Sequence, residues 1–414
     1  MGRVVFRGAT VLDGEHLPRP GLTVVVDDNR ITSVSGGESV ELGADDRVID
    51  LEGATLMPGM VTCHFHASYH ELGAVPGPFG LEEPPALQAV RAVNNLERVL
   101  MSGFTSAVSA GAPFAIDASM RRAISEGAIA GPRLVPGSRD VSTTGHANDA
   151  APWYWKLGAP GALHLCDGPD EFRKAVREEI KEGAKIVKMF VTGGHAVPRE
   201  AERIEMTRAE MAAAIEAAHL RGAMVRGHIA NREAILMAVD LGIDVIDHGD
   251  GMDLECIERI VAAGTFVVPS MFFVYRLWEM VKGMNPTMAQ AMRDDLDAAF
   301  AILPVAAEAG VKLVLGDDYG AVGFPHGIYG EELEFYVKVA GIAPLDVVRW
   351  ATVNGADLMG RGDELGTVTA GKLADLLVVD GDPIADISVL ADKSKIKAIM
   401  KDGRFVKDEA GRIT

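Results

Sequence analysis

The chain has 414 residues, of which 48% are hydrophobic and 24% are charged, and its net charge is −19. This length predicts one large barrel-type domain with an appendage, or two domains. The acidic balance argues against nucleic acid or an anionic membrane as partner, because phosphate groups bind to positive patches. Cys63, Cys166 and Cys256 suggest no disulfide framework. With no secretory signal and no long apolar run, a soluble cytoplasmic protein is expected.

Both ends of the chain read as short β-strands with turns. Residues 3–14, 21–36 and 46–59 contain strand-like apolar segments separated by Asp, Asn and Gly. Residues 366–382 and 396–409 show the same pattern of short apolar segments separated by turn residues. Because chain termini often lie close together, we predict that they build one small β-sandwich domain. Its predicted limits are residues 1–57 plus 358–414, with residues 58–357 forming the other domain.

The middle of the chain alternates apolar strands with helices. The predicted strands are residues 59–66, 105–111, 132–139, 184–191, 223–230, 243–249, 265–270 and 311–318. Helical segments such as 169–183, 207–222 and 231–242 each end in Gly, a typical C-terminal cap. Strands that alternate with helices in this way predict a (β/α)8 TIM barrel. The alternative is a doubly wound sheet, but the chain contains no Gly-x-Gly-x-x-Gly fingerprint.

Charged and metal-binding side chains stand at the carboxyl ends of five predicted strands. They are His64, His66, Lys188, His228, His248 and Asp318. Taken singly, a strand-end His is usually structural, a strand Lys reaches water and a terminal Asp caps a helix. All five strand ends, however, meet at the face where barrel enzymes build their sites. His-x-His places two imidazoles on one face of a strand, and imidazole with carboxylate suits Zn²⁺ or a similar ion.

This residue set resembles that of the amidohydrolase superfamily of metal-dependent hydrolases. The motif "PGMVTCHFH" and the C-terminal "GTVTAGKLADLLVVDGDP" carry the likeness along the whole chain. The segments "GFTSAVSAG" and "STTGHAND" resemble the subgroup of imidazolonepropionase-like proteins and Xaa-Pro dipeptidases. The resemblance implies two divalent metal ions, by default zinc. They would be held by His64, His66 and Asp318 on one side and His228 and His248 on the other, bridged by a carboxylated Lys188.

The resemblance also implies a mechanism, in which a bridging hydroxide attacks an amide carbonyl. Asp318 would act as general base and then general acid. His146 would stabilise the oxyanion or hold a substrate carboxylate. The remaining candidate substrate contacts are Tyr69, His70, His195 and His326.

Three positions depart from the pattern of the family. Thr62 replaces an Asp before the first His, Asp317 adds a second carboxylate beside Asp318, and Ala230 replaces a polar aromatic residue.

Cleavage of a small amide is the first hypothesis for the function. A deaminase, cyclic-amide hydrolase or lactonase on the same scaffold is the second, and a catalytically inactive binding or assembly paralogue is the third. A homo-oligomer is an open expectation.

Overall fold

The computed structural model describes residues 2–36, 40–72, 83–146, 149, 154, 161–193 and 203–409. The chain divides into two compact units. The first comprises Met1–Thr62, Arg98–Ser106 and Gly327–Thr414, and the second comprises Cys63–Glu97 and Ala107–His326. The first unit thus includes residues 327–357, which the predicted boundaries place in the barrel domain. The boundaries themselves stay a prediction.

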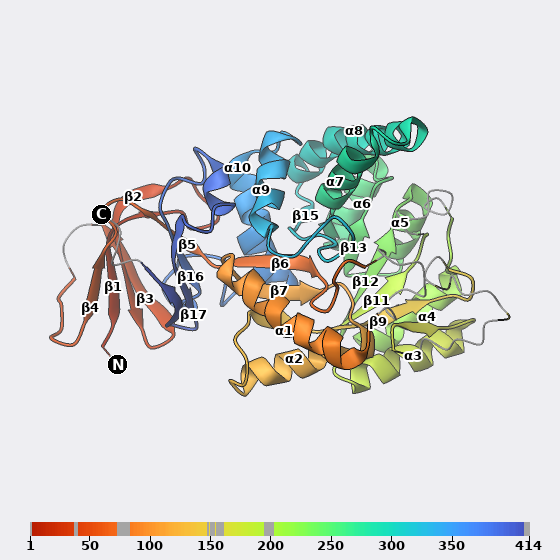
Figure 1. Cartoon of the computed structure of the whole chain (residues 1–414), viewed down its shortest axis with the longest axis horizontal. Coiled ribbons are helices and arrows are strands. Elements are labelled where there is room, and N and C mark those ends of the chain that lie inside the picture. Colours follow the sequence, from red (N-terminus) through yellow and green to blue (C-terminus); the bar gives the residue numbers. More distant parts are fainter. Residues whose placement is uncertain are drawn as a thin grey trace. The chain divides into compact units, whose positions relative to one another are not determined.

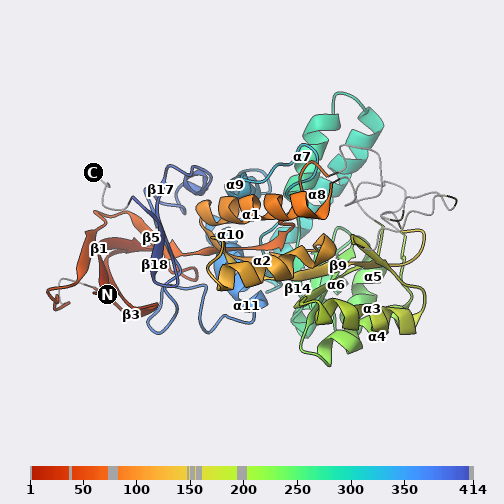
Figure 2. The same cartoon turned by 60° about the horizontal axis from the view of Figure 1, so that its bottom comes forward.

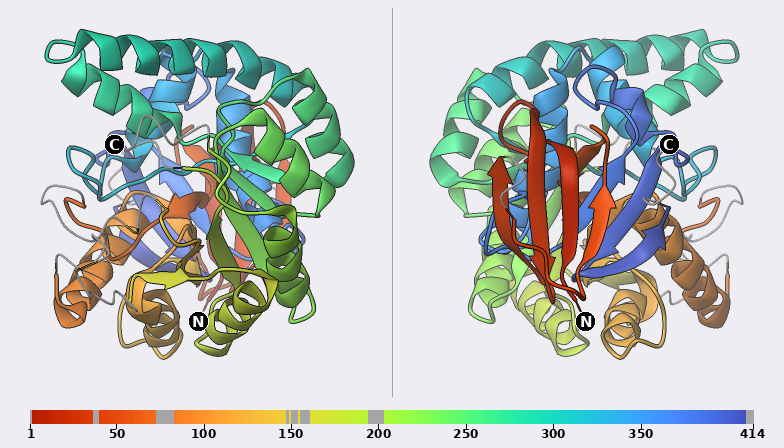
Figure 3. Two further views of the ribbon diagram at one scale, coloured as in Figure 1. Left: turned by 90° about the vertical axis from the view of Figure 1, so that its right-hand side faces the viewer. Right: turned by 90° about the vertical axis from the view of Figure 1, so that its left-hand side faces the viewer.

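Strands from both ends of the chain form one sheet in the first unit (Figure 3, right). Its order is β18 (Arg404–Asp408), β17 (Ile396–Lys401), β16 (Leu376–Val379), β5 (Thr55–Pro58), β1 (Val4–Val11), β2 (Arg19–Asp27) and β3 (Arg30–Gly36), with β4 (Arg47–Asp50) paired to β1. Strand β16 pairs antiparallel with β5, so that Leu376 lies opposite Pro58. Buried side chains such as Phe6, Val24 and Val378 form its core. The prediction that both termini build one small β-domain is confirmed.

The first unit also contains short helices. They are α9 (Tyr329–Lys338), α10 (Pro344–Arg349), a π-helical turn at Trp350–Asn354, α11 (Gly355–Leu358) and a 3-10 turn at Ile387–Leu390. Among all the helices of the described ranges, none has the length and hydropathy that crossing a membrane requires.

Parallel strands form the centre of the second unit (Figure 1). A seven-stranded sheet has the order β10 (Leu163–Leu165), β9 (Gly137–Ser142), β11 (Ile186–Phe190), β12 (Met224–Ile229), β13 (Val245–His248), β14 (Phe266–Val268) and β15 (Lys312–Leu313). A three-stranded sheet comprises β6 (Met60–Phe65), β7 (Phe104–Ser109) and β8 (Arg133–Val135). Strands β6 and β7 begin in the first unit and end in the second. Every pair in the larger sheet is parallel, as connections through helices require.

Helices connect these strands. They are α1 (Pro85–Met101), α2 (Ile116–Ser125, after a 3-10 turn at Pro113–Ala115), α3 (Pro169–Lys181), α4 (Arg208–His219), α5 (Arg232–Asp240), α6 (Leu254–Ala263), α7 (Met271–Val281) and α8 (Pro286–Glu308). Helices α3 and α4 pack side by side (Figure 2). Thr207 and Glu210 form a capping box at the start of α4, and Asn231 caps α5. Gly222 and Gly242 follow these helices with φ of 66° and 84°, values that cost glycine little. The alternation confirms the predicted (β/α)8 barrel.

The predicted strand at residues 132–139 is divided in two. Pro136 has no N–H to donate to a ladder, and the segments on its two sides belong to different sheets, β8 to the smaller and β9 to the larger. Its carbonyl still accepts a hydrogen bond from the Lys185 N–H at 2.8 Å. Proline therefore marks the place where the chain passes from one sheet to the other.

The last predicted strand, residues 311–318, keeps ladder pairing only at Lys312–Leu313. Beyond it, the Cys63 N–H donates to the Leu315 carbonyl at 2.6 Å. The Asp317 N–H donates to the His64 carbonyl at 3.1 Å. These two bonds keep the segment alongside β6, and they bring the end of the last strand next to the end of the first.

A buried carboxyl group in the first turn of α2 should make stability depend on pH. Burial raises the pKa of Asp117 to about 7, although hydrogen bonds from Ser109 and Gly137 act to lower it. A folded-state pKa above the unfolded value means that stability falls as pH rises from about 4 to about 7. We expect Asp117→Asn to have a free energy of unfolding roughly 1–4 kcal/mol above that of wild type at pH 8. Denaturant unfolding at pH 5 and pH 8 checks this, and an equal difference at both pH values would contradict it.

Candidate metal centre

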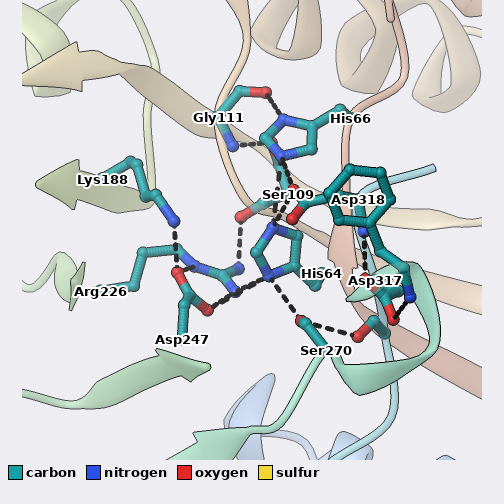
Figure 4. A network of polar contacts seen from close by, with 12 residues as sticks. His64, His66, Ser109, Gly111, Lys188, Arg226, Asp247, Ser270, Asp317 and Asp318 are labelled. Carbon is teal, nitrogen blue, oxygen red and sulfur yellow. Dashed lines mark hydrogen bonds and ion pairs between the residues drawn. The ribbon is translucent and has the colours of Figure 1, made fainter. Parts of the chain in front are cut away.

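Three potential metal ligands converge at the ends of the first and last barrel strands (Figure 4). His64 and His66 alternate with Phe65, so both imidazoles lie on one face of the strand. Their Nε2 atoms are 3.3 Å apart. Asp318 Oδ1 lies 3.0 Å from Nε2 of His64 and 3.3 Å from Nε2 of His66. Ligand atoms about 2.0 Å from a tetrahedral zinc ion are separated by about 3.3 Å, so this spacing fits one ion.

Hydrogen bonds on the far side of each ring turn Nε2 toward this cluster. His66 Nδ1 lies 2.8 Å from the Gly111 carbonyl oxygen, which can only accept, so Nδ1 carries the proton. His64 Nδ1 lies 3.3 Å from Ser270 Oγ and 3.4 Å from Asp247 Oδ1. Metal-binding histidines usually donate their second N–H in this way. Both Nε2 lone pairs are thereby available to a cation.

The charges of the cluster also suit a cation. Burial lowers the pKa of His66 to about 4, so the imidazole is neutral at pH 7. Burial alone would raise the pKa of Asp318, but the neighbouring His64 and His66 hold it well below its usual value. The Asp318 side chain remains 28% exposed. Imidazole nitrogens together with an ionised carboxylate form the donor set that zinc and similar divalent ions prefer.

Two further predicted ligands continue the row of imidazoles. His228 is the penultimate residue of β12 and His248 is the last residue of β13, and their ring centroids are 4.3 Å apart. The His248 ring lies 5.5 Å from the His64 ring. His248 has a φ of 71°, a left-handed conformation that is rare for a residue with a side chain and is often found at functional sites. The structure therefore brings the four histidines into one continuous group.

Lys188, the remaining predicted ligand, is buried on β11 and forms an ion pair. Its Nζ donates to Asp247 Oδ2 at 2.6 Å. The same carboxylate receives Arg226 Nε at 2.9 Å and also bonds to Arg226 Nη2. Burial would raise the pKa of Asp247, yet the positive charges of Arg226 and Lys188 hold it well below its usual value. The amine of Lys188 thus belongs to a buried charge network next to His64 (Figure 4).

Aromatic rings border the row of histidines. Tyr69 stacks on His66 with ring centroids 4.1 Å apart, and Phe190 stacks on His228 at 5.0 Å. His146 lies against Phe190 at 4.6 Å. Burial lowers the pKa of His146 to about 4. These contacts place Tyr69 against a potential ligand, and His146 against the phenylalanine ring that stacks on another.

The other predicted substrate contacts are less close to the cluster. His70 is exposed one residue after Tyr69. His326 packs on Phe65, whose side chain points to the opposite face of β6 from those of the two adjacent histidines. His195 lies outside the described residues. Asp317 has a clear place, because its carboxylate accepts the N–H groups of Asp318 at 2.8 Å and Phe273 at 3.0 Å and so fixes the loop that carries Asp318.

Three further residues, Arg226, Asp247 and Ser270, contact or face potential ligands without being predicted from the sequence. For Arg226 the sequence does contain a signal of its place in the site. Arg226 stands two residues before His228, so a period of 2 turns both side chains to the same face of the strand. For Asp247 and Ser270 the pattern gave no comparable signal, since an Asp before a strand-end His and a Ser before a helix are common.

Comparisons with known proteins agree with this geometry. The Amidohydrolase family model matches residues 55–406. The chain is similar to the ochratoxinase of Aspergillus niger, with 27% identity over 85% of this chain and 75% of that protein. It is also similar to the imidazolonepropionase of Symbiobacterium thermophilum, with 25% identity over 97% of this chain and 93% of that protein. Among solved structures, a Xaa-Pro dipeptidase with bound methionine in its active site is 28% identical, with a TM-score of 0.86 over 98% of this chain and all of that one.

The family match spans most of the chain, and the similar proteins are hydrolases by name. The predicted resemblance is thereby confirmed. The chain is a hydrolytic enzyme and belongs to the amidohydrolase family.

Proposed function

We propose that this enzyme is a metal-dependent hydrolase that cleaves an amide C–N bond of a small molecule, such as a dipeptide, an N-acyl amino acid or an aryl amide. The cluster of His64, His66 and Asp318 carries the proposal, because its ligand atoms lie within 4.8 Å of one another. The likeness to a Xaa-Pro dipeptidase favours a peptide-like amide. The likeness to an ochratoxinase keeps the choice open to substrates other than dipeptides.

The proposed metal centre holds two divalent ions, with zinc as the first choice from its nitrogen and oxygen donors. His64, His66 and Asp318 would bind one ion, His228 and His248 the other, and a carboxylated Lys188 would bridge them. The continuous row of buried histidines supports two adjacent ions. Bound there, such ions supply a water of lowered pKa and polarise the carbonyl of the substrate.

Asp318 is the proposed proton carrier. Its carboxylate is ionised, and its side chain is the most exposed of the three clustered ligands, at 28% against 1% for His64 and 5% for His66. It would take the proton of the attacking water and deliver it to the leaving nitrogen. The two N–H bonds that fix Asp317 keep the following carboxylate in place.

The substrate would lie between the aromatic borders of the histidine row. Tyr69 and Phe190 provide flat apolar surfaces next to the potential ligands. His146 is neutral at pH 7 and would donate a hydrogen bond to the carbonyl oxygen or to a carboxylate of the substrate. His70, His195 and His326 remain proposed contacts of the substrate.

A mass-spectrometric turnover screen tests the proposal. Metal-loaded enzyme would be incubated with pooled dipeptides, N-acyl amino acids, aryl amides, cyclic amides, lactones and amino-substituted heterocycles. We expect cleavage within one amide class, and we expect chelation of the metal to remove it. Turnover only of the heterocycles or cyclic compounds would favour deamination or ring opening instead. Turnover that survives complete metal removal would contradict a metal-dependent mechanism.

A further inference from the structure

A buried ion pair lies next to His64 and has no part in the proposed reaction. Arg226 on β12 and Asp247 on β13 both have 0% side-chain exposure. The guanidinium contacts both carboxylate oxygens, with Nε 2.9 Å from Oδ2 and Nη2 bonded to Oδ1. Such a two-point contact fixes the plane of the carboxylate as well as its position.

The other edge of the guanidinium is fixed to the strands that carry the site. Arg226 Nη1 donates to the Cys63 carbonyl at 2.9 Å and to the Ser109 carbonyl at 2.8 Å. These residues lie near the ends of β6 and β7, which belong to the smaller sheet, whereas Arg226 belongs to the larger one. One side chain therefore links the strand of His64 to the strands of His228 and Asp247.

Asp247 in turn contacts two of the proposed ligands. Its Oδ2 accepts from Lys188 Nζ at 2.6 Å, and its Oδ1 lies 3.4 Å from His64 Nδ1. Ser270 Oγ lies 3.3 Å from the same Nδ1 and donates its proton to the Gly316 carbonyl at 3.1 Å. Both close partners of Nδ1 are thus acceptors, and Nδ1 carries the proton. Arg226 Nη2 lies 3.5 Å from the same Nδ1, but it donates to Asp247 Oδ1.

We propose that Asp247 is a positioning residue that orients His64 and Lys188 for metal binding, and that Arg226 positions Asp247. The inference rests on the proposed metal-dependent function. Asp247 fixes the tautomer of His64 whose Nε2 faces Asp318, and it holds the Lys188 side chain on the same side of the site. Stability alone does not account for the pair, because apolar residues of similar volume often support a fold equally well. Apolar residues could not fix a tautomer.

The first test is the zinc affinity of Asp247→Asn, measured by competition with a chromogenic chelator. Asparagine has a similar shape, but one of the two carboxylate oxygens becomes an N–H₂ group. This group would face either His64 or the two donors on the other side, Lys188 Nζ and Arg226 Nε. Loss of such an outer contact to a ligand typically weakens metal binding about 10–100-fold, and we expect a loss in this range. Arg226→Lys keeps the charge but not the two-point contact, so it should also weaken binding. The visible spectrum of the Co²⁺ form should change in both variants.

The control is a second buried ion pair of the same unit. Arg139 Nη2 lies 2.6 Å from Glu179 Oε1, with side-chain exposures of 19% and 4%. Arg139→Met should lower stability without changing the zinc affinity. Should Asp247→Asn fail to fold, Arg226→Lys loosens the two-point contact on Asp247 and should still weaken zinc binding severalfold. Zinc affinity within twofold of wild type in folded Asp247→Asn, or in Arg226→Lys if that variant alone folds, would overturn the positioning role. Wild-type enzyme that binds no metal would instead overturn the proposed function.

Discussion

Replacing Asp318 with asparagine should lower kcat by about a hundredfold to ten-thousandfold, the usual contribution of a general acid–base group. The amide can still place an oxygen near His64 and His66, but it cannot accept a proton from water and return it to nitrogen. The substitution should leave the fold intact, since the backbone N–H of Asp318 keeps its bond to Asp317. Steady-state kinetics on the substrate found by the screen would measure the effect.

Asp294→Asn is the matched control for this experiment. Asp294 lies on α8 of the same unit, is exposed and accepts a hydrogen bond from Gln290. Its replacement should leave kcat and KM unchanged. If Asp318→Asn retained more than a tenth of the wild-type kcat, another residue would have to be the proton carrier.

Lys188→Ala should lose both the second metal ion and most of the activity. The proposed bridge is the carbamate of this side chain, and its removal leaves the second ion with only His228 and His248. We expect metal analysis to show about one ion or fewer per chain in place of two. In wild-type enzyme equilibrated with ¹³C-bicarbonate, a carbamate carbon signal should appear by NMR, and it should be absent from the variant.

Lys185→Ala provides the control, since Lys185 is exposed three residues earlier in the same segment. This variant should keep its metal, its carbamate signal and its activity. A short carboxylic acid such as acetate fits the volume that Lys188 vacates and should restore part of the metal content to Lys188→Ala. Full metal content and full activity in Lys188→Ala without added acid would refute the bridging role.

Most of the fold was accessible from the sequence because it follows from local periodicity. Apolar strands alternating with amphipathic helices are read over short windows, and the glycines after α4 and α5 mark the helix ends. The single β-domain built from both termini was predicted from their similar patterns of strands and turns, whereas the pairing of β16 with β5 emerged only from the structure. The division of the strand at Pro136 was missed, because an apolar run on both sides of a proline looks like one strand until its two halves pair with different sheets.

For the site, the sequence by itself determined which chemical groups stand at the strand ends. His64, His66 and Asp318 were identified from strand phase and a barrel assumption, and the structure brings their ligand atoms together. Only the tertiary structure decided what orients them. Whether Asp247 contacts Lys188 and His64, and whether Arg226 reaches the Cys63 carbonyl, depends on side chains from strands far apart in sequence. Periodicity fixes the face on which a side chain lies, whereas a hydrogen bond needs a distance within a few tenths of an ångström, and that precision arises only when the strands pack.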